Sequence, residues 1–247
     1  MWYIINAGMA LQLFAAIFSY KRGAWLAILL MPIVFLLMKR GWLDKLLYAG
    51  LIVVTLLVVY MVDDNRFYRY APNYQSTIWH EGDLSGHLAA TFDGTEISGM
   101  ERFYRWVAAK NMIADMPLFG AGPSTFNQVY KEYADDAFRT YVSDNPEQST
   151  THNYFLMTFS EQGFPGGLLF IALCVVMVVK AVRLYPRMQD KEMQRMLAML
   201  LLSLFTILFH SLLNELIEVD KVGAMFWLIL LLIHKMEVWH EQRPLAG

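Results

Sequence analysis

Long apolar runs separated by short charged turns make up most of this chain. Six runs are long enough to cross a hydrocarbon core of about 30 Å as helices of about 20 residues. They are residues 2–19, 23–38, 43–62, 154–180, 195–213 and 223–239. One polar stretch, residues 63–152, interrupts them and holds most of the carboxylates and tyrosines. The pattern predicts an all-α polytopic membrane protein with about six transmembrane helices and one long, partly helical loop.

The order of these runs predicts a simple organisation. Three transmembrane helices would occupy residues 1–62, the loop residues 63–152, and three more helices with a short tail residues 153–247. The N-terminal run lacks the basic start and small-residue cleavage site of a signal peptide, so we interpret it as a retained helix. All helices would belong to one membrane domain.

Basic residues gather in the turns on one side of the predicted spans. These residues are Lys39, Arg40, Lys45, Lys180, Arg183, Arg187, Lys191, Arg195, Lys235 and Arg243. The loop instead holds seven basic and thirteen acidic residues, a net charge of −6 (7 − 13). The positive-inside rule therefore predicts cytoplasmic termini and a loop on the outer face, which is the periplasm for a bacterial inner (plasma) membrane.

Lys21 and Arg22 depart from this charge pattern, because they lie between the first two spans on the predicted outer side. Long basic side chains at a helix end commonly extend toward the headgroups. A cation at this position could instead hold an anion at the outer membrane surface. Topology alone leaves both interpretations open.

Composition agrees with a membrane protein. Hydrophobic residues make up 57% of the chain and charged residues 17%, against about 25% charged in an average globular protein. A net charge of −2 without a basic stripe argues against a nucleic-acid partner. Cys174 is the single cysteine, so no internal disulfide can form, and no Cys/His cluster has zinc spacing.

Within the loop, residues 100–116 repeat with the period of a helix. One face would carry the apolar side chains, including Met100, Phe103, Val107 and Ile113. The other face would carry Arg102, Arg105 and Lys110. Pro117 should end this helix, because the residue before a proline avoids the α region. Ser124 is then predicted to cap a second helix that extends through Tyr133.

The fourth predicted span begins irregularly, with Glu161, Pro165 and three glycines in the run SEQGFPGG. Proline removes a backbone donor and glycine weakens a helix, so we expect a short interfacial helix, a bend, and a membrane span from about Phe164. On an unbroken helix, Glu161 would lie opposite His152, nine residues before it. Glu161 would approach His152 only if the break redirected it.

Five polar residues form the candidate site near the outer membrane plane: Arg22, Arg102, Arg105, His152 and Glu161. Arginine carries a permanent charge and a planar fork of donors suited to phosphate oxygens. Histidine, whose unperturbed pKa is about 6.5, is the usual general base near neutral pH. Together they fit metal-independent displacement at a lipid-linked phosphate or diphosphate. Structural hydrogen bonding is the alternative, and it is commoner for a lone histidine or arginine.

Three runs carry a resemblance to a known family. They are SYKRGAWLAILL, SGMERFYRWVAAKNMIADMPLFGAGPSTF and THNYFLMTFSEQGFPGGLLF. In this order, across a long outer loop, they resemble the conserved blocks of the O-antigen ligase/polymerase family, from about Phe14 to Phe170. Lys21 replaces the family's usual small hydroxyl residue before Arg22.

The resemblance implies a membrane glycosyltransferase that needs no metal or other cofactor. Members move a saccharide from an undecaprenyl-diphosphate carrier to an acceptor hydroxyl at the periplasmic face. The acceptor is lipid A–core in ligases, the growing glycan in polymerases, and a protein Ser or Thr in oligosaccharyltransferase relatives. The implied partners are therefore a lipid-linked glycan, an acceptor glycan or lipid A–core, and membrane lipid.

The family motifs also imply a role for each candidate residue. Arg22 and Arg102 match the arginines that bind the diphosphate, and Arg105 is an extra cation that could exchange roles with Arg102. His152 matches the histidine expected to activate the acceptor. Glu161 matches the acidic position of the third block, so we include it with His152 as a catalytic candidate.

Two other classes of function stay open. Family members usually carry several further spans before the first block, so we expect this chain to be the C-terminal portion of a longer protein. A truncated, non-catalytic membrane partner or part of a flippase-like transporter is then an alternative. A metal-dependent membrane hydrolase is disfavoured, because the loop offers no ligand cluster.

Overall fold

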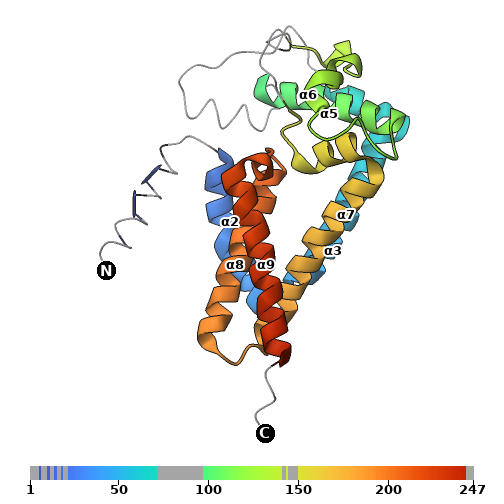
Figure 1. Ribbon diagram of the computed structural model, residues 1–247. Coiled ribbons are helices and arrows are strands. Elements are labelled where there is room, and N and C mark those ends of the chain that lie inside the picture. The colour runs from blue at the N-terminus through green and yellow to red at the C-terminus, as the bar shows by residue number, and fades with distance from the viewer. Residues whose placement is uncertain are drawn as a thin grey trace. The chain divides into compact units, whose positions relative to one another are not determined.

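The computed structural model describes residues 22–71, 97–140, 143 and 150–242, with a few isolated positions before residue 22. Throughout this described part the chain forms helices and connecting loops and contains no strand (Figure 1). The all-α prediction is therefore confirmed. The first predicted span, residues 2–19, lies almost wholly outside the described residues.

Five long α-helices dominate the described chain (Figure 1). They are α2 (Arg22–Lys39), α3 (Leu43–Val62), α7 (Tyr154–Leu184), α8 (Lys191–Ser211) and α9 (Asp220–Gln242). The segments Leu43–Arg69, Tyr154–Arg187, Lys191–Ser211 and Asp220–Gln242 are long and apolar enough to cross a membrane. A sixth helix of similar length but more polar composition is α5 (Ile97–Asp115). Shorter elements are η1 (Asp63–Tyr70), α6 (Phe126–Val129), η2 (Tyr130–Glu132), η3 (Asp136–Phe138), η4 (Tyr185–Arg187) and η5 (Leu216–Glu218).

The chain divides into two compact units. The first consists of residues 1–47 and 175–247, and the second of residues 48–174. The boundaries fall inside α3 and α7, so each of these helices contributes one part to each unit.

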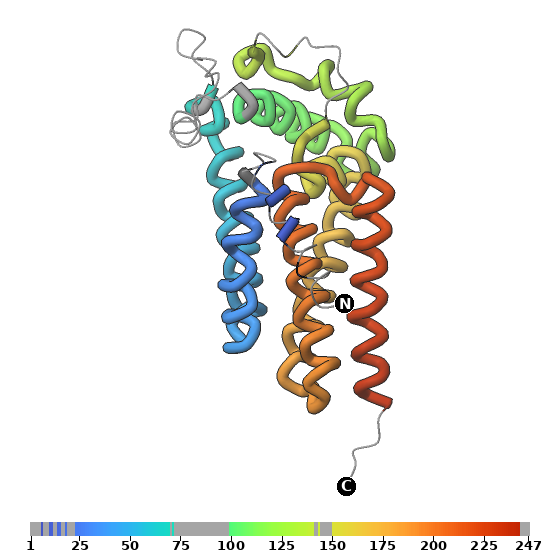
Figure 2. Tube along the Cα trace, turned by 90° about the vertical axis from the view of Figure 1, so that its left-hand side faces the viewer, coloured from blue at the N-terminus to red at the C-terminus, as the bar shows by residue number. Residues whose placement is uncertain are grey.

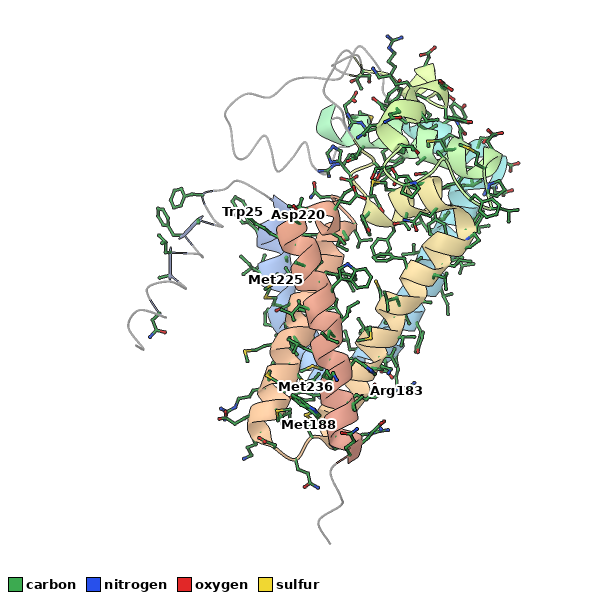
Figure 3. The ribbon with its side chains drawn as sticks, in the orientation of Figure 1. Trp25, Arg183, Met188, Asp220, Met225 and Met236 are labelled. Atoms are coloured by element: carbon green, nitrogen blue, oxygen red, sulfur yellow. The ribbon has the colours of Figure 1, made fainter. Side chains whose placement is uncertain are left out.

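The first unit is a helical bundle in which α8 packs against both α2 and α9 (Figures 1 and 2). Its buried side chains recur at helical spacing, as in Leu197, Leu201 and Leu204 on α8. Figure 3 shows Trp25 of α2 and Asp220 of α9 at the same end of this bundle. The start of α2 and the short α8–α9 connection therefore lie on one side.

The opposite end of the bundle contains an ion pair. Lys180 of α7 lies 2.5 Å from Glu237 of α9, measured from Nζ to Oε2. Both side chains are partly exposed, at 34% and 23%. His234 lies one turn before Glu237, with Nδ1 3.6 Å from the same carboxylate oxygen. These contacts fix the last part of α7 against α9.

The second unit contains a separate apolar core built on α5. The buried apolar side chains of α5 are Met100, Tyr104, Val107, Ala108, Ala109 and Met112. All of them except Met100 belong to one core cluster with Phe67, Phe126, Tyr130, Phe138 and Met157 from other elements of the unit. The rings of Phe126 and Tyr130 stack with centroids 5.2 Å apart. This core positions the loops that carry the candidate site.

The predicted helix at residues 100–116 is confirmed as α5, which ends at Asp115 shortly before Pro117. Its predicted faces need two corrections. Tyr104 and Met112 occupy the core, whereas Ile113 is only half-buried. Arg105 is not on a solvated face, because its side chain is only 11% exposed. The buried face of α5 is therefore wider than the apolar positions alone indicated.

Candidate active site

The helix α7 breaks at the glycine-rich run that sequence analysis singled out. Gly163 has φ 68° and ψ −172°, which no helix accommodates, while the residues on both sides are helical. The predicted bend is confirmed, and the apolar part of α7 begins at Phe164. The break lies after Glu161, so it does not redirect Glu161 toward His152.

The break in α7 binds the loop that follows α5. The Phe164 amide donates to the Pro117 carbonyl over 2.7 Å. The Ala121 amide donates to the Ser160 carbonyl and the Gly122 amide to the Glu161 carbonyl, each over 2.9 Å. These three backbone hydrogen bonds join the PLFGAG motif to the SEQGF motif. We call this contact the glycine junction.

Two glycines make the glycine junction possible. Gly120 has φ +63°, and a Cβ atom there would lie 2.6 Å from the Gln162 amide nitrogen. Gly163 has φ +68°, and a Cβ atom there would lie 2.7 Å from the Pro117 carbonyl oxygen. Both the left-handed φ and the close backbone approach therefore require glycine at these positions.

Glu161 sits beside the glycine junction with only 4% of its surface exposed. One carboxylate oxygen accepts the Ser124 amide over 2.9 Å and the other accepts the Phe126 amide over 3.0 Å. Two charge-assisted hydrogen bonds offset the cost of burying this carboxylate. Glu161 thereby holds the backbone that enters α6.

The prediction that Ser124 caps the second helix is wrong. The residue before α6 is Thr125, whose side chain makes no capping bond. Ser124 itself has φ 59°, and its amide is bound by the distant Glu161. The helix is also shorter than predicted, because α6 gives way to the 3₁₀ segment η2. A carboxylate from another segment has replaced the local cap.

The His152 backbone is held by its two neighbours. The Trp106 indole N–H donates to the Thr151 carbonyl over 2.8 Å, so α5 is joined to the start of α7. The Asn153 side chain accepts the Leu156 amide over 3.0 Å and caps α7. Thr151 Oγ1 donates to the Asn153 carbonyl over 2.7 Å, which closes the turn around His152.

His152 lies within this turn in a left-handed conformation, with φ 52°. Histidine visits this region more readily than most residues, yet it still costs on the order of 1–3 kcal/mol. The side chain is half-buried. The surrounding hydrogen bonds therefore hold His152 in a conformation that an isolated chain would rarely adopt.

The two arginines of α5 have different surroundings. Arg105 Nη2 lies 3.1 Å from Glu101 Oε2, and the two side chains are only 11% and 9% exposed. Glu101 also accepts the hydroxyl groups of Thr140 and Ser143. Arg102 is half-buried, and its side chain makes no hydrogen bond or ion pair in the part of the chain that the structure describes. The Arg105 guanidinium is therefore held by an ion pair within the protein, whereas the Arg102 guanidinium could bind a ligand.

Arg22 is the first residue of α2 and belongs to the first unit. The next residue, Gly23, packs against the end of α8. A Cβ atom at Gly23 would lie 3.2 Å from Leu213 Cδ1 and 3.6 Å from His210 Cε1. The Arg-Gly pair of the first motif therefore begins α2 in close contact with α8.

Sequence reasoning missed two of these arrangements. The hydrogen bond from Trp106 to Thr151 spans 45 residues, so no local pattern could predict it. The ion pair of Glu101 with Arg105 did have a signal, because the residues are four apart on one helix. The hydroxyl groups that complete the ion pair come from beyond η3, outside any local pattern.

Tyr104 and Tyr133 are among the tyrosines of the second unit whose pKa is raised. Burial raises the pKa of Tyr104, whose ring lies in the core. A hydrogen bond to Asp115 raises the pKa of Tyr133. Because both pKa values are raised from about 10, both phenols stay neutral at physiological pH.

Four helices long and apolar enough to cross a membrane, in an all-helical chain, indicate a polytopic membrane protein. A sequence profile described as O-antigen ligase matches residues 7–171, well over half of the chain. The chain therefore belongs to the O-antigen ligase family, whose members are membrane enzymes of the ligase or polymerase type acting on glycans and lipid-linked substrates. No curated protein and no solved structure matches the chain.

Proposed function

We propose that this protein transfers a saccharide from an undecaprenyl-diphosphate carrier to an acceptor hydroxyl at the periplasmic face of a bacterial inner membrane. One observation carries the proposal. Arg102 lies one helical turn before Trp106, and Trp106 donates to the carbonyl that directly precedes His152. Residues one turn apart have Cβ atoms about 5–6 Å apart. A permanent cation and an imidazole are thus carried on connected segments of one unit.

In the proposed reaction, the acceptor oxygen attacks the anomeric carbon of the donor sugar. The bond between that carbon and the diphosphate oxygen breaks, and its electron pair leaves with the lipid diphosphate. His152 takes the proton from the acceptor hydroxyl as a general base. Arg102 stabilises the negative charge that develops on the leaving diphosphate.

Arg22 is proposed to bind the diphosphate as well. It belongs to the other unit, so this role rests on the match of its motif to the family. Topology is compatible with this role but does not select it, because a basic side chain at a helix end would also break the positive-inside pattern. The charge on the leaving group is then met by arginine side chains, and we expect transfer to persist after treatment with a metal chelator.

Arg105 and Glu161 are proposed to position the site rather than to contact the substrate. The carboxylate of Glu101 binds Arg105, and two backbone amides bind Glu161. Because both charges are already bound within the protein, neither side chain is proposed to bind a ligand. Of the two arginines that could bind the diphosphate, Arg102 and Arg105, we therefore favour Arg102.

The acceptor we favour is lipid A–core, which makes the protein a ligase. A growing glycan or a protein hydroxyl would use the same chemistry at His152, because each supplies an alcohol oxygen. Supplying each acceptor separately to membranes with labelled lipid-linked glycan distinguishes the three. Transfer to the growing glycan or to protein, without transfer to lipid A–core, would replace the ligase assignment.

Alanine substitutions of His152, Arg102 and Arg22 in the full-length protein test the mechanism. We expect transfer from labelled undecaprenyl-diphosphate glycan to fall at least about 100-fold for His152→Ala, a typical effect of losing a general base. Membrane levels should stay normal. Arg69→Ala is the matched control, because Arg69 is exposed and lies in the same unit as His152.

Wild-type rates in His152→Ala and Arg22→Ala would contradict the mechanism. The non-catalytic alternative makes a different prediction, namely no turnover by the wild-type protein. Turnover by this chain alone, in membranes with labelled lipid-linked glycan, would exclude that alternative.

A further inference from the structure

Two large apolar side chains project from the loop between α5 and α6. Leu118 is 64% exposed and Phe119 is 85% exposed. They sit at the tip of the glycine junction, in the part of the second unit that carries the polar site. Large exposed apolar side chains next to each other commonly mark a surface that contacts another molecule or a membrane.

The backbone that carries Leu118 and Phe119 is fixed. On one side, the Pro117 carbonyl accepts the Phe164 amide over 2.7 Å. On the other side, Gly120 packs so closely on α7 that no side chain fits between them. Because both flanks are held by backbone contacts, the loop cannot simply fold the two side chains back into the core.

The same contact sets the depth of the loop along α7. Phe164 is the first residue after the break in α7, and no charged residue follows it before Lys180. Sixteen residues of helix span about 24 Å at 1.5 Å per residue, close to a hydrocarbon thickness. Pro117 therefore contacts α7 at the outer end of its membrane-spanning part.

The outward face of α7 continues the apolar surface of the loop. Phe164, Leu168, Leu169 and Val176 are 47%, 57%, 72% and 48% exposed. In a helix that crosses a membrane, a face with this exposure meets lipid acyl chains. The Phe164 amide binds the Pro117 carbonyl, so the backbone where this face begins lies next to the backbone that leads into Leu118 and Phe119.

We propose that Leu118 and Phe119 form an interfacial anchor that inserts among the acyl chains of the outer leaflet. Continuity with the lipid-facing side of α7 favours bilayer lipid as the occupant. The anchor would fix the height of the loop above the membrane. Because α5 precedes the loop and Trp106 joins α5 to Thr151, it would also fix the height of Arg102 and His152. The proposal requires that α7 crosses the membrane with the loop on its outer side, and it does not depend on the proposed reaction.

Depth-dependent fluorescence quenching tests the anchor. Phe119→Cys is introduced into the full chain together with Cys174→Ala, so that only position 119 carries a thiol, and this thiol is labelled with an environment-sensitive fluorophore. The labelled protein is reconstituted into phosphatidylethanolamine/phosphatidylglycerol vesicles that contain no lipid-linked glycan. We expect lipids with a quencher high on the acyl chain to reduce the emission at least about threefold. Ala137→Cys is the control, because Ala137 is exposed on η3 in the same unit, and should be quenched little.

Three outcomes would overturn the proposal. No quenching at position 119 would mean that the loop faces water. A blue-shifted emission without lipid quenching would mean that protein covers the loop. Quenching that appears only after undecaprenyl diphosphate is added would make the carrier's isoprenoid chain the occupant. Leu118→Cys provides a second labelled position, and the proposal requires it to agree with position 119.

Discussion

The two compact units hold their motifs in different ways. In the first unit, helices pack through interdigitating apolar side chains, and the motif glycine Gly23 meets the flexible end of Leu213. In the second unit, loops are held by backbone hydrogen bonds, buried polar groups and glycines with positive φ. Side-chain packing can adjust to small changes, whereas a backbone junction cannot.

The two units should therefore differ in how well they tolerate substitutions. At most positions of the first unit composition matters more than the identity of the residue; Gly223 is an exception, because an added Cβ atom there would lie 2.4 Å from the Ile217 carbonyl oxygen. The second unit sets the position of Arg102 and His152 through contacts between segments far apart in sequence. We therefore expect substitutions in the second unit to affect stability and transfer more strongly than comparable ones in the first.

Gly163→Ala should have the largest effect. The added Cβ atom meets the Pro117 carbonyl oxygen at 2.7 Å, and the residue must keep φ +68°. We expect the free energy of unfolding to fall by on the order of 3 kcal/mol, measured by thermal unfolding in detergent. Gly99→Ala is the control, because nothing lies within 4 Å of its added Cβ atom. Equal melting of Gly163→Ala and wild type would show that the glycine junction does not fix the second unit.

Glu161→Ala should come next. It leaves the buried Phe126 amide without an acceptor, which costs about 1–3 kcal/mol, whereas the amide of the exposed Ser124 can bind water instead. Hydrogen exchange at these two amides should accelerate. Glu161→Gln keeps one acceptor oxygen and should restore much of the protection and of the transfer rate. A transfer rate abolished in Glu161→Gln, with protection intact, would instead support direct catalysis by Glu161.

Trp106→Phe should have a smaller effect. It keeps an aromatic ring but removes the N–H that donates to the Thr151 carbonyl over 2.8 Å. We expect a loss of about 1 kcal/mol in stability and a lower kcat for transfer, because the turn around His152 loses a support. Trp42→Phe, at a 53% exposed position, is the control. Identical losses in both variants would argue against a positioning role for the indole.

Gly23→Ala should have the smallest effect of the four. The nearest atom to the added Cβ is the end of the Leu213 side chain, at 3.2 Å. A rotamer change of Leu213 can relieve this contact, so we expect less than about 1 kcal/mol of destabilisation. A loss as large as that of Gly163→Ala, in the same unfolding assay, would remove the difference between the two units.

Hydrophobic patterning was sufficient to predict the long helices of the described residues. Spans of about 20 apolar residues locate the long helices, because that length crosses the hydrocarbon core. The helical period at residues 100–116 locates α5, because one face of that helix is buried in the core. The bend at Gly163 was also predictable, since glycine and proline both weaken a helix. These features depend on residues close together in sequence.

The contacts of the site were not predictable in this way. Ser124 has the chemistry of a cap, but its amide is bound by Glu161, 37 residues later. Arg102 and Arg105 look equivalent by composition, and only the buried Glu101 distinguishes them. Tyr104 enters the core although its hydroxyl is polar, because its ring packs edge-on against Tyr130. Each outcome depends on a tertiary partner that no local period specifies.

The central claim is that Arg102 binds the substrate diphosphate, whereas Arg105 stabilises the fold through its ion pair with Glu101. The most direct measurement compares Arg102→Ala with Arg105→Ala, recording thermal unfolding and transfer from labelled lipid-linked glycan in the same preparations. We predict that Arg102→Ala unfolds like wild type and loses transfer, and that Arg105→Ala unfolds earlier because it leaves Glu101 buried and unpaired. Normal transfer in Arg102→Ala, with transfer lost in a stably folded Arg105→Ala, would contradict the account.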